Sequence, residues 1–176
     1  MSIQITKNLL DILSREASRR DRDFYAGNFT ETALIEHLFR YWLESALGAD
    51  GFDEINREVS YETRKDGQRK ACDLLAHKNN RRHWIELKVA YENTGYTHAE
   101  LTADIERLSL TSKDDGRIYV AIFLAMSSDV PKKLQDIHAA AEGIGASVHH
   151  CSVNIAAPES WREWSDAHLH VTTCSW

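Results

Sequence analysis

The chain has 176 residues, 43% of them hydrophobic, and a formal net charge of −6 at pH 7. A chain of this size buries roughly two-thirds of its unfolded surface, which predicts one domain, residues 1–176, around a single core. It contains no run of about 18 apolar residues and no basic-then-apolar segment at its start, so we expect a cytoplasmic protein that does not bind membranes.

Two helices are predicted first. Apolar residues recur at helical spacing over residues 3–20, and the polar stretch that follows ends this helix. A second helix is expected from about Asn28, because Asn28 and Glu31 have the spacing of a capping box. It ends near Gly48, and its apolar residues form one face.

Three strand signals follow, separated by residues that favour tight turns. Asp66-Gly67 separates the first two strands, and Asn79-Asn80 separates the second two. This pattern predicts an antiparallel three-stranded meander with strands at residues 55–62, 70–77 and 83–91.

The remainder of the chain alternates helices with strands. Thr97 and Glu100 form a second capping box that opens a helix, and Pro131 opens another. The apolar run between these helices is typical of a strand buried on both faces. The first helix is expected at residues 97–108, the buried strand at 117–126, the second helix at 131–142 and a final strand at 146–155. The predicted order is α-α-β-β-β-α-β-α-β, an α/β fold, and residues 161–176 receive no assignment.

A candidate catalytic group lies on the meander. Asp73 is in its second strand, and Glu86 and Lys88, which share a face because they are two residues apart, are in its third. The short hairpin brings Asp73 close to Glu86, and two carboxylates with water and phosphate oxygens are ligands that Mg²⁺ prefers. Phosphodiester hydrolysis also needs a positive group, which Lys88 can supply. The alternative is a set of cross-strand charge pairs on a solvated face.

The arrangement of these residues resembles the PD-(D/E)xK nuclease superfamily, which includes restriction endonucleases, Holliday-junction resolvases and DNA-repair nucleases. Twelve residues separate Asp73 from a Glu-Leu-Lys sequence, and the resemblance covers residues 28–126. One departure is Cys72, which stands where the motif has proline. The resemblance implies a restriction-endonuclease-like core of order αβββαβ around a mixed sheet, with an N-terminal helical extension and a C-terminal helix and strands at residues 1–27 and 127–176.

The resemblance also implies further site residues. Many members take an acid from the helix before the meander, and Glu36, at the edge of that helix's apolar face, is the expected third metal ligand. This helix should cover part of the face that carries Glu86, whereas Glu44 should point to solvent. Members often use a polar residue of the helix after the third strand, which indicates Arg107 as a phosphate contact. The alternative for Arg107 is an ion pair within its own helix, with Asp104 or Glu100.

A basic segment surrounds Asp73. Between Arg64 and Arg82 there are seven basic residues and two acids, so the segment carries +5 and the remainder of the chain −11. We interpret these residues either as phosphate contacts on the two hairpin tips or as solvated surface. The residues expected to bind nucleic acid are Arg64, Lys65, Arg69, Lys70, Lys78, Arg81, Arg82 and Arg107.

A zinc site is not expected. The three cysteines lack CxxC spacing, which also argues against a disulfide framework. His168 and His170 would share a strand face, but no third ligand stands at a recognisable spacing from them.

The sequence therefore predicts a magnesium-dependent endonuclease, with Mn²⁺ as a substitute and, by resemblance, DNA as the substrate. The alternative is a non-catalytic module of the same fold, a partner-binding or regulatory subunit of a defence or repair system, which would fit the acidic net charge. A third hypothesis is an enzyme acting on nucleotides or another phosphate ester. Cutting both strands of a duplex often calls for two active sites, so a homodimer is a further expectation, with the helix at residues 3–20 as its candidate contact.

Overall fold

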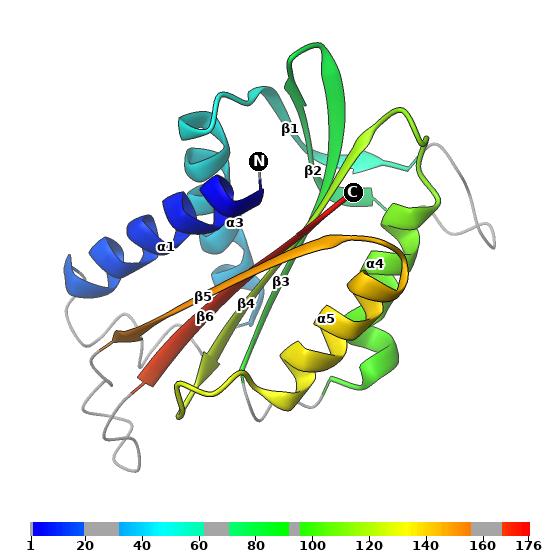
Figure 1. The fold of residues 1–176 in the computed structure, drawn as a ribbon. Coiled ribbons are helices and arrows are strands. Elements are labelled where there is room, and N and C mark those ends of the chain that lie inside the picture. The colour runs from blue at the N-terminus through cyan, green and yellow to red at the C-terminus, as the bar shows by residue number, and fades with distance from the viewer. Residues whose placement is uncertain (1, 20–31, 62–70, 92–95, 156–166) are drawn as a thin grey trace.

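The structure, a computed structural model, describes residues 2–19, 32–61, 71–91, 96–155 and 167–176, and in residues 2, 16–19, 32–37, 91, 155 and 167 it describes the backbone only. Within these residues one sheet lies between two pairs of helices (Figure 1). The elements in chain order are α1 (Ser2–Arg19), α3 (Thr32–Ala49), β1 (Asp53–Ser60), β2 (Ala71–Lys78), β3 (Arg81–Tyr91), α4 (His98–Ser109), β4 (Gly116–Ala125), α5 (Lys132–Gly143), β5 (Ser147–Ile155) and β6 (Ala167–Ser175).

The sheet is mixed and has the strand order β1-β2-β3-β4-β6-β5. β1, β2 and β3 are antiparallel neighbours, which confirms the predicted meander. β4 runs parallel to β3, because α4 carries the chain back across the sheet between them. β6 is antiparallel to both β4 and β5. A mixed α/β fold, the coarser part of the prediction, is therefore confirmed.

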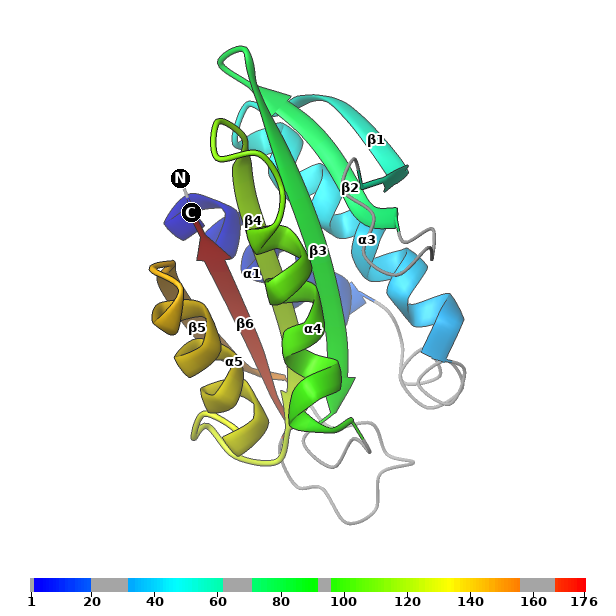
Figure 2. The same cartoon turned by 90° about the vertical axis from the view of Figure 1, so that its right-hand side faces the viewer.

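Two hydrophobic cores lie on the two faces of the sheet, and Figure 2 shows the helices on either side. Side chains alternate along β3, so Ile85 and Leu87 enter one core and Trp84 enters the other. α1 and α3 cover the first face with apolar side chains at helical spacing, such as Ile5 and Leu9. α4 and α5 cover the second face. Among the described helices, none combines the length and apolar character needed to cross a bilayer.

The turn chemistry read from the sequence is confirmed where the structure describes it. Asn79 and Asn80 connect β2 to β3 with φ angles of 54° and 61°, the left-handed region that Asn tolerates. Thr97 caps α4 with the reciprocal hydrogen bonds of a capping box. The turn expected at Asp66-Gly67 and the helix start expected at Asn28 lie outside the described residues.

Two features of the fold differ from the prediction. β6, for which no element was assigned, lies inside the sheet, and its buried positions are partly polar, with His170 and Thr172 fully buried. Because apolar and polar residues are mixed at these buried positions, the number of apolar residues in the sequence does not indicate a strand here. The helix that carries Glu36 also covers the face of Ile85 and Leu87, so the expectation that it covers the face of Glu86 is wrong, and α4 lies there instead.

Gly116 provides a test of packing at the start of β4. It pairs with His83 of β3, and a Cβ added to Gly116 would lie 2.0 Å from Nδ1 of the buried His83 ring. We expect Gly116→Ala to lower the free energy of unfolding by about 1–3 kcal/mol, because the buried ring must shift to make room for the added methyl group. Urea unfolding measures this, with Gly48→Ala as the control, since no atom lies within 4 Å of the Cβ position there. Equal stability of both variants would contradict the prediction.

Candidate active site

Asp73 and Glu86 meet where the regular pairing of β2 with β3 ends. The last paired residues are Leu74 and Ile85, and one further step of the same register would place Asp73 opposite Glu86. There the Asp73 side chain bonds to the backbone of β3: its Oδ2 accepts a hydrogen bond of 2.8 Å from the backbone N–H of Leu87. This bond fixes the Asp73 carboxylate beside β3. The structure therefore brings the two expected metal ligands together.

The Glu86 carboxyl group is buried, with 4% of the residue exposed. It accepts a hydrogen bond from the hydroxyl of Tyr61. Burial, followed by the charge of Asp73, raises the pKa of Glu86 to about 8, while the Tyr61 hydrogen bond and the charge of Arg107 act in the opposite direction. A cation close to this pair would relieve the repulsion between the two carboxylates.

Arg40 of α3 is the main cationic partner of Asp73. Its guanidinium donates hydrogen bonds of 2.9 Å to Oδ1 of Asp73 and 3.1 Å to Oε1 of Glu58. The Arg40 side chain is 8% exposed and the Asp73 side chain 15%, so this ion pair is largely shielded from water. Sequence reasoning missed Arg40, because it lies on the polar side of the helix and nothing local indicates its partner.

The polar side of α3 faces β1 and β2 and not solvent. Glu44, expected in water, has a side chain only 20% exposed and accepts two hydrogen bonds from Arg57 of β1, the longer at 2.7 Å. Arg40 lies one helical turn before Glu44, and Glu36 lies one turn before Arg40. The side chain of Glu36 itself is outside the described part of the chain.

Lys88 and Arg107 lie on the α4 side of the sheet. The Lys88 ammonium lies 4.2 Å from the centre of the Tyr96 ring, just before α4, although its side chain shares a strand face with Glu86. Arg107 forms an ion pair with Asp104 within α4, the alternative that the sequence left open. Its positive charge still acts on Glu86.

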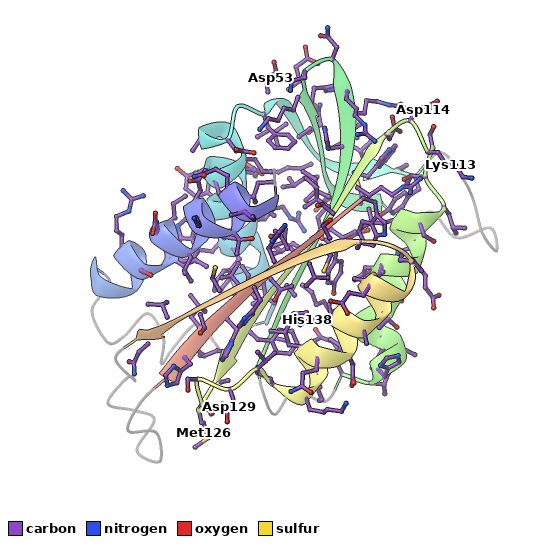
Figure 3. All side chains as sticks on the ribbon, viewed as in Figure 1. Asp53, Lys113, Asp114, Met126, Asp129 and His138 are labelled. Atoms are coloured by element: carbon purple, nitrogen blue, oxygen red, sulfur yellow. The ribbon has the colours of Figure 1, made fainter. Side chains whose placement is uncertain are left out.

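The basic residues at the β2–β3 turn are held by acidic and carbonyl partners. Lys78 pairs with Asp50 at 2.7 Å, and Arg82 pairs with Asp115 at 3.0 Å. Arg81 donates to two backbone carbonyls of the α4–β4 loop, whose Lys113 and Asp114 are labelled in Figure 3. Lys78, at the end of β2, lies five positions after Asp73, which is roughly 17 Å along a strand. The phosphate contacts expected at this tip stay a prediction. The other expected contacts, Arg64, Lys65, Arg69 and Lys70, lie outside the described residues.

The pair of Asp73 and Glu86 fits a magnesium ion by the chemistry of its donors. Carboxylate oxygens are hard ligands, and protein Mg²⁺ sites often use only one or two of them, with water and substrate oxygens completing the shell. Within the described residues, no group of three or more His, Cys, Asp or Glu side chains is placed to hold a metal ion. Glu36, the third expected ligand, has no described side chain.

Three histidines form a separate cluster between α5 and the sheet. His150 and His170 are joined by a 3.1 Å contact between ring nitrogens, and the other nitrogen of His170 lies 3.0 Å from the carbonyl oxygen of Ser127. His138, labelled in Figure 3, lies 2.9 Å from the hydroxyl of Thr172. Burial, with the charges of the other two rings, lowers the pKa of His150 to about 4.

We expect this cluster to make the fold sensitive to acid. A histidine with an ordinary pKa of 6.5 in the unfolded chain and about 4 in the folded chain binds a proton more readily when unfolded. Its stabilising contribution is complete above pH 6.5 and is lost as the pH falls toward 4. His150→Gln should therefore flatten the fall in melting temperature between pH 7 and pH 4. The matched control is His98→Gln, because His98 is exposed. If the melting temperature fell equally steeply with pH in wild type and in His150→Gln, the prediction would be contradicted.

Comparisons with protein-family models, with curated proteins and with solved structures found no match to this chain.

Proposed function

We propose that this chain is a magnesium-dependent nuclease with a restriction-endonuclease-like core, and that DNA is its substrate. The element order α3-β1-β2-β3-α4-β4 supports this, because it has the order αβββαβ that the PD-(D/E)xK resemblance implies. The antiparallel meander followed by a parallel strand also agrees with the mixed sheet of that core.

The observation that carries the proposal is the meeting of Asp73 with the buried Glu86 at the point where β2 and β3 part. A buried carboxylate beside a second acid is unfavourable in a purely structural role. Such a pair is common where a site is built for chemistry. The sequence predicted that the two acids lie close together, and their buried geometry supports the proposal.

In this proposal Asp73 and Glu86 hold Mg²⁺, with Glu36 as the third carboxylate. The bound cation would polarise the phosphate and lower the pKa of a water molecule. Lys88, on the face of Glu86, stabilises negative charge at the phosphate once its ammonium leaves the Tyr96 ring. Arg40 and Arg107 keep the two carboxylates in place and partly neutralised.

A cleavage assay tests the proposal. Purified protein is incubated with supercoiled, linear and single-stranded DNA in Mg²⁺ or Mn²⁺, beside Asp73→Asn and Lys88→Ala, with the exposed Glu106→Gln as control. The proposal expects cleavage by wild type and Glu106→Gln only. It also expects Mg²⁺ to raise the melting temperature of Lys88→Ala but not of Asp73→Asn, because Asp73 is a proposed ligand and Lys88 is not. Identical behaviour of all four proteins would refute the proposal for these substrates.

The second candidate is a non-catalytic module of the same fold. Arg40 favours it, because its guanidinium already satisfies Asp73 without a metal ion. The acidic net charge of −6 also opposes strong binding of a polyanion. Under this alternative, Mg²⁺ would leave the melting temperature of wild type unchanged.

A further inference from the structure

The two edge strands of the sheet, β1 and β5, differ in how they are protected. An edge strand presents unpaired N–H and C=O groups, and charges, bulges or proline commonly prevent other chains from pairing with it. β1 has four charged residues, and its pairing with β2 is irregular between Asp53 and Asn56. Glu54 and Glu58 also have positive φ angles. These features make β1 a poor partner for another strand.

β5 has none of these protective features. Its nine residues, Ser147–Ile155, include no Asp, Glu, Lys, Arg or Pro. It pairs with β6 along its whole length without a register shift. Figure 1 shows it at the outer side of β6, and it is the last strand of the sheet among the described residues. Its outer edge is therefore long, regular and uncharged.

We propose that β5 pairs antiparallel with β5 of a second copy of this chain, so that one sheet continues through a two-fold axis. An odd strand of nine residues has a central residue, Cys151, and a two-fold axis there pairs all nine positions. Cys151 then faces Cys151 of the other copy, and His150 faces Ser152. No like charges meet in this pairing, although each chain carries −6 overall.

The apolar face of α1 is not available as the contact. The apolar face of α1, which the sequence suggested as a dimer contact, packs inside the protein against β5 and β6 through Ile5, Leu9 and Leu13. Cys151 is a partly exposed free thiol, whereas Cys72 and Cys174 are buried. The thiol of Cys151 is therefore a natural reporter of the axis.

Light scattering tests the interface directly. The proposal expects wild type at twice the chain mass of 20.1 kDa. Cys151→Lys and Cys151→Glu should each be monomeric, because two like charges face each other at the axis. An equal mixture of the two should form a dimer again, since Lys then faces Glu. A control charge at the exposed Glu106, Glu106→Lys, should leave the dimer intact.

Circular dichroism establishes that the charged variants are folded. If either variant is unfolded, mild oxidation of wild type decides the question, because a covalent dimer joined through Cys151 should form. Cys151→Ser should form no covalent dimer but should remain dimeric by light scattering. A monomeric wild type would overturn the proposal, as would dimers that survive Cys151→Lys or a mixture that stays monomeric. This test is independent of the cleavage assay, because a protein that is monomeric and still cuts DNA would refute the proposed interface but not the proposed function.

Discussion

Replacing Glu86 with glutamine is expected to abolish DNA cleavage and to raise the stability of the folded chain at the same time. Cleavage should fall by at least about 100-fold, because the variant lacks one of the carboxylates proposed to bind the metal ion. Stability should rise because Glu86 is buried beside Asp73, and a neutral amide removes the repulsion. The amide oxygen can still accept the hydrogen bond from Tyr61. Thermal unfolding should show an increase of at least about 3 °C at pH 8.

The pH dependence of this gain has a definite sign. The pKa of Glu86 is raised from 4.5 to about 8 on folding, so the folded chain holds the proton more tightly. Wild type should therefore lose stability as the pH rises from 4.5 to 8, whereas Glu86→Gln should not. The difference between the two proteins should be small at pH 5 and large at pH 8. A variant less stable than wild type at pH 8 without metal would contradict this account, and Glu106→Gln is the control.

Replacing Arg40 with alanine is expected to destabilise the metal-free chain by about 3–5 kcal/mol, since it leaves the shielded carboxylate of Asp73 without its cation. The variant loses the hydrogen bond of 2.9 Å from Arg40 to Asp73, and the Asp73 carboxylate still lies next to Glu86. If the two acids hold Mg²⁺, the ion should restore part of this stability, because it neutralises the same carboxylates. Urea unfolding with and without Mg²⁺ measures both effects.

The matched control for Arg40 is Arg57, which also joins a helix to a strand. Arg57 pairs with Glu44, but its side chain is 56% exposed. Arg57→Ala should therefore change the free energy of unfolding by less than about 1 kcal/mol, with or without Mg²⁺. Failure of Mg²⁺ to restore any stability to Arg40→Ala would favour the non-catalytic module.

The meander and the pair of Asp73 and Glu86 were predictable because local signals determine them. Alternating apolar residues, an Asn-Asn turn and the two-residue period of a strand place these side chains without knowledge of distant packing. The same is true of β4, whose continuous apolar run agrees with its burial on both faces.

The partners of the site were not predictable, because they depend on how α3 docks on the sheet. A helical wheel places Arg40 and Glu44 on the polar side, which is usually the solvent side. In the structure that side lies over β1 and β2, where each charge has a partner of opposite sign. The basic residues of the β2–β3 turn likewise bind acids of neighbouring loops, which charge counting along the chain cannot show.

The position of β6 determines the order in which the sheet can be completed during folding. β6 follows β5 in the chain but lies between β4 and β5 in the sheet. β5 and β6 are consecutive antiparallel strands and can pair with each other as a hairpin, whereas β6 reaches β4 only across the intervening α5 and β5, so the pairing of residues 116–125 with residues 167–175 closes the longer loop. Pairings this distant in sequence carry a loop-closure cost and slow folding. The hydrogen bonds that join β6 to β4 should therefore acquire protection from solvent exchange later than those within the β5–β6 pair.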